Sequence, residues 1–236
     1  MNSPNDNKLL KNFPTATKKK IFPCLKLIHL PLGKVLYESG QSITNVYFPI
    51  DCIVSLLYVT ENGSSTEISV IGNEGIVGIA VFMGGQSTPK RAVVQSAGYA
   101  YYLSAPILLS EFNNNTTIRM LLLRYTQALI AQMAQTAVCN RHHSIDQQLC
   151  RWLLLSLDRL RTNNLTMTQE LIANMLGVRR EGVTEAAGKL QKLGVITYKR
   201  GHITVTDRIK LERLCCECYA VVKMETDRLG EFSNIA

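Results

Sequence analysis

Residues 179–189 place several hydrogen-bonding side chains on one face of a predicted helix, where they could meet the edges of nucleic acid bases. Arg180 can hold guanine through two hydrogen bonds in the major groove, and Glu181 can accept one from the amino group of cytosine. Thr168, Arg179 and Lys189 are better suited to phosphates. A solvated helix with scattered charges is the alternative interpretation.

The elements that would position these side chains are two short helices joined by a tight turn. Thr168 can cap a helix over residues 169–176, and Gly177 can supply the left-handed conformation that ends it. Ala173 leaves room where a second helix, beginning after Val178, would cross the first. The apolar residues that would form the shared core are Ile172, Leu176, Val178, Val183 and Ala186. Together these spacings predict a helix-turn-helix.

A predicted β hairpin follows within residues 196–206, with the sequence Lys199-Arg200-Gly201-His202 at its tip. Such a hairpin forms a wing whose basic tip can reach backbone phosphates. The order of helix-turn-helix and then hairpin favours DNA binding. The candidate DNA-contacting residues are Thr168, Arg179, Arg180, Glu181, Thr184, Glu185, Lys189, Lys199 and Arg200.

A longer helix is predicted over residues 117–140, because this segment has no Gly or Pro and its apolar residues recur every three or four positions. The recurring residues are Ile118, Leu122, Tyr125, Leu129, Met133 and Thr136 or Ala137. We interpret this stripe as the seam of a homodimer, since an isolated helix between two domains has little else to bury its apolar side. A core helix packed on the chain's own β domain is the alternative.

The rest of the chain divides by composition. Residues 27–108 are rich in β-branched and aromatic residues punctuated by turn sequences, which predicts a sandwich or jelly roll. The predicted organisation is a basic N-terminal arm (1–26), a β domain (27–116), a dimerisation helix (117–143), a winged helix-turn-helix domain (144–220) and a C-terminal tail (221–236). The predicted fold class is therefore α+β.

Charge and hydropathy narrow the function further. The net charge is +8, and residues 141–207 carry ten basic and six acidic side chains, which suits a module that binds a polyanion. No apolar run is long enough to span a membrane and residues 1–20 do not form a secretory signal, so we expect a cytoplasmic protein without a membrane partner. No P-loop or G-x-S-x-G sequence occurs, so we expect no enzyme.

The G-x-x-R-E sequence at Gly177–Glu181, the segment Leu165–Ala173 and the long helix resemble the Crp/Fnr family of bacterial transcription regulators, over about residues 27–220. The resemblance implies an N-terminal cyclic-nucleotide-binding-like β roll (a double-stranded β-helix, or jelly roll), a long dimerisation helix and a C-terminal winged helix-turn-helix. It also implies a homodimer on a palindromic operator in double-stranded DNA, contact with RNA polymerase and an unknown small-molecule effector.

The effector pocket that the resemblance implies is only partly matched. Members that bind cyclic nucleotides carry Gly-Glu where this chain has Gly75-Ile76, unless Glu74 takes that place. Lys90 and Arg91 still offer basic groups. The candidate effector-binding residues are Gly75, Gly78, Lys90 and Arg91, and we expect an effector other than cyclic AMP.

Seven cysteines raise the question of a metal centre. Cys215, Cys216 and Cys218 are closely spaced, but oxygen-sensing members of the family use a cysteine set near the N-terminus, where this chain has only Cys24 and Cys52. A second possible zinc set lies near a helix junction and comprises Cys139, His142, His143 and Cys150. A histidine there more often caps the helix end or faces a phosphate. We therefore expect no metal and no cofactor.

The sequence thus predicts a sequence-specific DNA-binding transcription regulator that acts as a homodimer. The alternative is a cyclic-nucleotide-type sensor that acts through protein partners and keeps a vestigial DNA head. Binding to a palindromic DNA fragment would distinguish the two.

Overall fold

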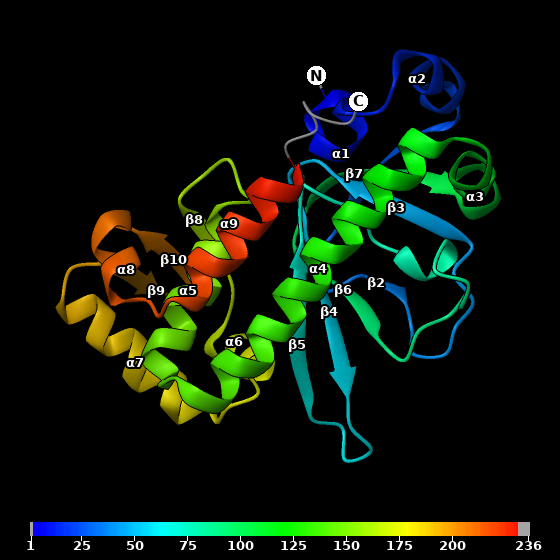
Figure 1. The fold of residues 1–236 in the computed structure, drawn as a ribbon. Helices are drawn as coiled ribbons and strands as arrows, with labels where there is room; N and C mark the ends of the chain where they lie inside the picture. Colours follow the sequence, from blue (N-terminus) through cyan, green and yellow to red (C-terminus); the bar gives the residue numbers. More distant parts are fainter. Residues whose placement is uncertain (1, 231–236) are drawn as a thin grey trace.

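The computed structural model describes residues 2–230, and its N-terminal half is built on two antiparallel sheets (Figure 1). The first sheet has the strand order β1 (Lys26–Leu30), β7 (Gly98–Ser104), β3 (Asn45–Pro49). The second has the order β2 (Val35–Tyr37), β6 (Arg91–Ser96), β4 (Ile53–Val59), β5 (Ser65–Ile71). A short 3-10 helix, η3 (Ile79–Val81), lies between β5 and β6. This is the expected jelly-roll β domain.

The core of the β domain lies between the two sheets. Phe48 of β3 packs in the same buried cluster as Val54 of β4 and Val94 of β6. Strand β4 is buried on both faces, because Ile53 and Leu57 point the other way and pack against the C-terminal part of the chain. That double burial explains why β4 is almost continuously apolar, instead of alternating as a strand with one solvated face does.

The N-terminal residues fold onto the β domain, and this corrects the expectation of a separate basic arm over residues 1–26. They form η1 (Pro4–Asp6), α1 (Lys8–Lys11), α2 (Thr15–Ile21) and η2 (Phe22–Cys24). Their apolar residues Leu9, Leu10, Phe13 and Ile21 belong to the β-domain core. The amide of Asn7 donates hydrogen bonds to the carbonyl oxygens of Pro49 and Gly75, both at 2.9 Å. Short apolar pairs without a clear period gave no hint of this long-range packing.

The long helix α4 (Thr116–His142) follows α3 (Ala105–Asn114) and begins at Asn115, whose side chain accepts a hydrogen bond from the Ile118 amide. The stripe predicted as a dimer seam faces inward instead. Ile118, Leu122 and Leu129 are at most 2% exposed and belong to the β-domain core. The seam prediction for this stripe is therefore wrong, and the alternative of a core helix is correct.

A second apolar stripe of α4 faces solvent. Met120, Leu123, Ile130 and Val138 are each 40–55% exposed. The exposed positions 120, 123, 127, 130 and 134 alternate steps of three and four residues, which is the spacing of a coiled-coil seam. Periodicity in the sequence could not distinguish the two stripes, because both recur at helical spacing on one helix.

The C-terminal half packs around α5 (Ile145–Leu157), which begins with the expected capping box between Ser144 and Gln147. The remaining elements are β8 (Asn164–Thr166), α6 (Gln169–Leu176), α7 (Arg180–Lys192), β9 (Ile196–Lys199), β10 (His202–Val205), α8 (Arg208–Leu214) and α9 (Cys218–Gly230). The strands form one antiparallel sheet in the order β8-β10-β9. None of the helices within residues 2–230 is long and apolar enough to cross a membrane.

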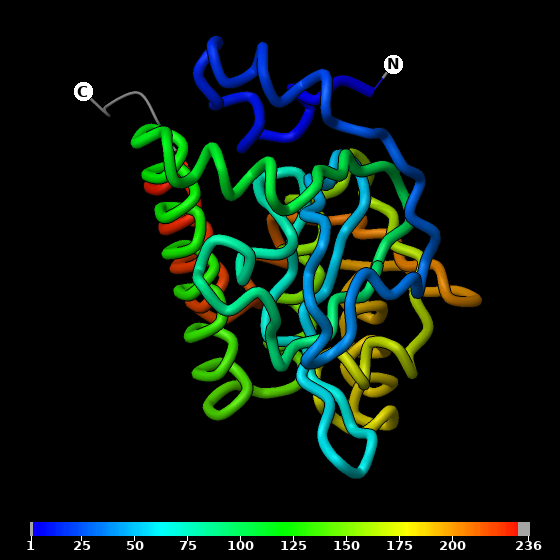
Figure 2. The backbone as a smooth tube through the Cα atoms, turned by 90° about the vertical axis from the view of Figure 1, so that its right-hand side faces the viewer, coloured from blue at the N-terminus to red at the C-terminus, as the bar shows by residue number. Residues whose placement is uncertain are grey.

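Helix α9 lies alongside α4, as Figures 1 and 2 both show. The two run antiparallel, since Cys218 at the start of α9 meets Gln135 while Leu229 near its end meets Arg124. A C-terminal tail was expected over residues 221–236. Residues 221–230 instead belong to this packed helix, and residues 231–236 lie outside the described part of the chain.

Candidate nucleic-acid interface

The helix-turn-helix forms from the local features that predict it. The Thr168 hydroxyl accepts a hydrogen bond from the Leu171 amide at 3.2 Å and caps α6. Gly177 has φ of 67° and ψ of 33°, so it ends α6 in the left-handed conformation that glycine tolerates best. Ala173 is buried where the helices approach, and its carbonyl accepts a hydrogen bond from the Val178 amide at 3.0 Å. Val183 of α7 is fully buried in the shared core.

The exposed face of α7 carries two arginines at its N-terminus. Arg179 is the N-cap residue and Arg180 the first residue of the helix. Within residues 2–230, neither guanidinium makes a hydrogen bond or an ion pair. Glu181 is exposed beside them. These groups are free to meet a ligand.

Other predicted contact residues of α7 are already engaged within the chain. The Thr184 hydroxyl lies 2.8 Å from Oε1 of Gln169. The Lys189 ammonium lies 3.0 Å from a carboxylate oxygen of Glu185 and 3.1 Å from one of Asp146. These two carboxylates raise the pKa of Lys189. Lys189 must release at least one of them to neutralise a phosphate fully, so its contribution should be smaller than that of Arg180.

The wing is the hairpin of β9 and β10, with Lys199 and Arg200 exposed at its tip. Arg200 has φ of 50°, and Gly201 after it also has positive φ, as a tight turn requires. The Tyr198 hydroxyl donates a hydrogen bond to the carbonyl oxygen of Met167 at 2.8 Å. The Met167 amide in turn donates to Gly201, so the wing is fixed to the segment just before α6.

Another side of this C-terminal domain is docked on the β domain. Ile53, Leu57 and Val70 of the sheet share a buried cluster with Trp152 and Leu149 of α5. This contact covers the outer face of β4 from Ile53 to Leu57, while Tyr58 and Val59 at the end of the strand stay exposed. The docked side therefore differs in chemistry from the side that carries Arg180.

A chain of buried polar groups crosses this contact. Oγ of Ser55 lies 2.5 Å from Glu67 and 2.7 Å from Oε1 of Gln95, and the Gln95 amide donates to Ser156 of α5 at 3.2 Å. A hydroxyl has only one proton to donate. Protonated Glu67 satisfies the chain, because it donates to Ser55, which then donates to Gln95. Burial raises the pKa of Glu67 to about 7, which agrees with this arrangement.

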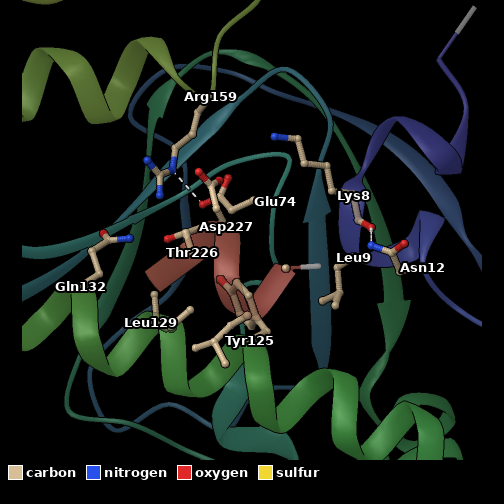
Figure 3. Close-up of a pocket in the computed structure, with 13 residues that line it drawn as sticks. Lys8, Leu9, Asn12, Glu74, Tyr125, Leu129, Gln132, Arg159, Thr226 and Asp227 are labelled. Carbon is tan, nitrogen blue, oxygen red and sulfur yellow. Dashed lines mark hydrogen bonds and ion pairs between the residues drawn. The ribbon is translucent and has the colours of Figure 1, made fainter. Parts of the chain in front are cut away.

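An ion pair adds a second link between the two domains. The Arg159 guanidinium, just after α5, lies 2.8 Å from a carboxylate oxygen of Glu74 in the β domain, and both side chains are largely buried (Figure 3). Arg159 also donates a hydrogen bond to the carbonyl oxygen of Leu155 at 2.6 Å. The pair lies at one wall of a cavity of about 300 Å³ between α1, α4 and α9. The polar residues around that cavity include Lys8, Glu74, Tyr125, Gln132, Arg159 and Asp227.

The predicted effector-binding residues do not line this cavity. Gly75 packs against Tyr125, and a Cβ there would lie 2.2 Å from the tyrosine ring. Gly78 has φ of 107°, a left-handed conformation, and directly precedes η3. Nζ of Lys90 lies 3.7 Å from the sulfur of Met133, and Arg91 pairs with Glu38 at 3.1 Å. Close packing and the left-handed conformation thus account for both glycines without a ligand.

Sequence reasoning missed a cluster of cysteine and histidine side chains at the end of α4. It treated Cys139 and His143 as one set and Cys216 and Cys218 as another, whereas the fold brings all four together. Hydrogen bonds from the neighbouring thiols of Cys139 and Cys215 lower the pKa of Cys216. The sequence contains the two close pairs Cys139/His143 and Cys216/Cys218, but only the packing of α9 on α4 brings the pairs together.

Comparison with known proteins agrees with this architecture. Residues 27–115 match the model of the cyclic nucleotide-binding domain, and residues 147–214 match that of the Crp-like helix-turn-helix domain. A global nitrogen regulator from Nostoc sp. is 24% identical over 191 residues, covering 77% of this chain and 85% of that protein. The global nitrogen regulator of Synechococcus elongatus is 21% identical, covering 89% of this chain and 97% of that protein.

Solved structures share the fold. A putative Crp/Fnr-family transcriptional regulator from Eubacterium rectale has a TM-score of 0.69 at 20% identity, covering 89% of this chain and 98% of its own. FixK2 from Bradyrhizobium japonicum has a TM-score of 0.67 at 15% identity, covering 81% of this chain and 98% of its own. With both domain models matched in the family's order, this chain belongs to the Crp/Fnr family and is a DNA-binding transcription regulator.

Proposed function

We propose that the protein regulates transcription as a homodimer that reads a palindromic operator with the N-terminal turn of α7. The observation that carries this proposal is the pair of exposed arginines, Arg179 and Arg180, which no carboxylate of residues 2–230 neutralises. Arg180 and Glu181 contact bases, because the first residues of such a helix enter the major groove. Thr168, Arg179, Lys199 and Arg200 contact phosphates, with smaller contributions from Thr184, Glu185 and Lys189.

Titration of selected duplexes tests this assignment. Duplexes enriched from a random library by the native protein are labelled and titrated at fixed salt. Arg180→Ala should weaken specific binding by about 1–3 kcal/mol, or about 5- to 150-fold. Lys34→Ala removes one exposed positive charge from the β domain and serves as the matched control, with an expected change under about twofold. Equal effects of the two substitutions would contradict the assignment of α7 as the reading helix.

The outward stripe of α4, comprising Met120, Leu123, Ile130 and Val138, is the proposed dimer seam. Exposed apolar side chains at coiled-coil spacing favour burial against a copy of the same helix. Helix α9 leaves this stripe exposed, since it packs along the side of α4 that carries Ala128 and Gln135. Pairing would place two reading helices at a fixed spacing, as a palindromic operator requires.

Sedimentation of full-length variants tests the seam. Ile130→Glu should shift the protein from dimer to monomer, because it places two carboxylates against each other across the axis. Leu32→Glu, on an exposed loop of the β domain, is the control and should leave the dimer intact. A native protein that sediments as a monomer at micromolar concentration would rule out this part of the proposal.

The cavity between α1, α4 and α9 is the proposed effector site. It is lined by residues of the β domain, of α4, which bears the proposed dimer seam, and of the C-terminal DNA-binding domain. Ile76 is buried in the core, so no carboxylate stands at that position for a ribose. Calorimetry with cyclic AMP should therefore show no binding, and tight binding would overturn this expectation. Contact with RNA polymerase is supported by family membership alone.

A further inference from the structure

Four side chains with metal-binding atoms meet where the end of α4 approaches the loop between α8 and α9. Cys139 lies in the last turns of α4 and His143 directly follows that helix. Cys216 lies in the loop that leads to α9, and Cys218 is the first residue of α9. One sulfur or ring nitrogen from each of the four residues lies within 4.8 Å of all the others. Sγ of Cys139 is 3.6 Å from Sγ of Cys216, and Sγ of Cys218 is 3.4 Å from Nδ1 of His143.

These separations match the ligand shell of a single tetrahedral ion. Zinc binds thiolate sulfur at about 2.3 Å and imidazole nitrogen at about 2.0–2.1 Å, so tetrahedral ligand atoms lie about 3.5–3.8 Å apart. The Cys139–Cys216 and His143–Cys218 distances therefore need changes of only a few tenths of an ångström, and the other pairs of ligand atoms lie within 4.8 Å. An iron–sulfur cluster fits less well, because its thiolates bind different irons and must lie further apart than these four atoms do.

The surrounding groups orient the ligands as a metal site requires. Nε2 of His143 lies 3.3 Å from a carboxylate oxygen of Glu217, which leaves Nδ1 facing the thiols. A carboxylate behind a ligating histidine is a common feature of zinc sites, where it fixes the ring orientation. The side-chain amide of Gln135 donates a hydrogen bond to Sγ of Cys218 at 3.0 Å. Such a donor stabilises a thiolate.

Burial also separates these residues from ordinary surface cysteines. Cys139 and Cys218 are fully buried and Cys216 is 6% exposed, while the His143 side chain is 14% exposed and Glu217 is open to solvent. An ion could enter along the side of His143 and Glu217 and would then be shielded from water. Thiols in a core often only fill space, but a space-filling role does not explain an imidazole nitrogen directed at them.

We propose that Cys139, His143, Cys216 and Cys218 together bind one Zn²⁺ ion. Three thiols lose their protons to the solvent as the ion binds, and no electron transfer is involved. The ion joins the end of α4 to the start of α9, so it closes the antiparallel helix pair at the base of the DNA-binding domain.

Metal analysis of the full-length protein without an affinity tag tests the proposal. The protein is reduced, stripped with a chelator, incubated with Zn²⁺ or Co²⁺ and freed of unbound ion. The expected result is one ion per chain, with the intense visible absorption of tetrahedral cobalt and the charge-transfer bands of cobalt bound to thiolate. Cys216→Ser should abolish both signals.

Matched controls separate metal binding from folding. Cys215→Ser changes a neighbouring thiol outside the set of four, and Cys24→Ser changes an exposed one, and both should retain one ion per chain. Glu217→Gln should still fold, because the side chain is exposed, and should bind the metal about 10- to 100-fold more weakly. The proposal fails if the reduced native protein retains no ion, if Cys216→Ser and Cys215→Ser bind equally, or if Cys139 and Cys216 are found joined as a disulfide.

Discussion

The C-terminal domain has a buried, paired arginine on the side that docks on the β domain and exposed arginines, unpaired within residues 2–230, on the side that faces solvent. On the docked side, Arg159 is buried, and its guanidinium pairs with Glu74 and donates a hydrogen bond to a backbone carbonyl. On the solvent side, Arg180 is exposed and no group of residues 2–230 neutralises it. The first arrangement holds the domain in place, and the second leaves charge available for a polyanion. The same residue type therefore serves structure or recognition according to its surroundings.

The largest expected effect comes from breaking the docked side. Arg159→Ala leaves the largely buried carboxylate of Glu74 without its partner, which should lower the free energy of unfolding by roughly 3–5 kcal/mol. Urea denaturation measures this change. Combining it with Glu74→Gln removes the orphaned charge and should recover part of the loss. The free energy of unfolding of Arg180→Ala should stay within about 0.5 kcal/mol of that of the native protein. Similar losses of stability for Arg159→Ala and Arg180→Ala would refute the contrast between a structural and a recognition arginine.

A smaller effect is expected at Gly177, where the two sides meet. Its φ of 67° disfavours any residue with a Cβ, and a Cβ there would also lie 2.6 Å from the hydroxyl of Thr66 in β5. Gly177→Ala should therefore cost about 1–2 kcal/mol of stability, measured by the same denaturation. Adding Thr66→Ala, which removes both the hydroxyl and the methyl group of that side chain, tests whether crowding contributes. A stable Gly177→Ala protein would show that the docked contact is loose.

A further effect concerns the dependence of stability on pH. Glu67 has its pKa raised by burial from 4.5 to about 7, so the folded protein holds a proton there that the unfolded chain has lost. This contribution to stability is complete below about pH 4.5 and declines as the pH rises towards 7. The carboxylate faces the charges of Arg151 and Arg159, which limit the rise. Glu67→Gln should remove this part of the pH dependence, as urea midpoints across that range would reveal. If Glu67→Gln left the slope of stability against pH unchanged, a group other than Glu67 would be responsible for it.

The solvent side could be predicted from the sequence because its determinants are local. Thr168, Gly177 and Arg180 lie within 13 residues of one another, and cap, turn and helix each depend on near neighbours. The jelly roll followed equally from short strands and turns. The family resemblance also named the right pair of domains.

What could not be predicted depends on contacts between distant segments. Leu122 and Leu123 both belong to apolar stripes of α4, and only the position of the β domain shows that the first is core and the second exposed. The burial of Leu10 depends on strands that follow it by dozens of residues. The approach of Cys216 to Cys139 likewise requires α9 to fold back along α4.

Base-resolved binding gives the most direct test of the central claim that α7 reads sequence while the wing holds the backbone. Affinities for operator duplexes, each with one base pair changed, are compared for Arg180→Lys and Arg200→Ala. Arg180→Lys keeps the positive charge but loses the bidentate pair of hydrogen bonds that arginine can make to guanine. It should relax preference at one base pair of each half-site. Arg200→Ala should weaken all duplexes alike and reduce the salt slope by about one. Full retention of base preference by Arg180→Lys would contradict the account.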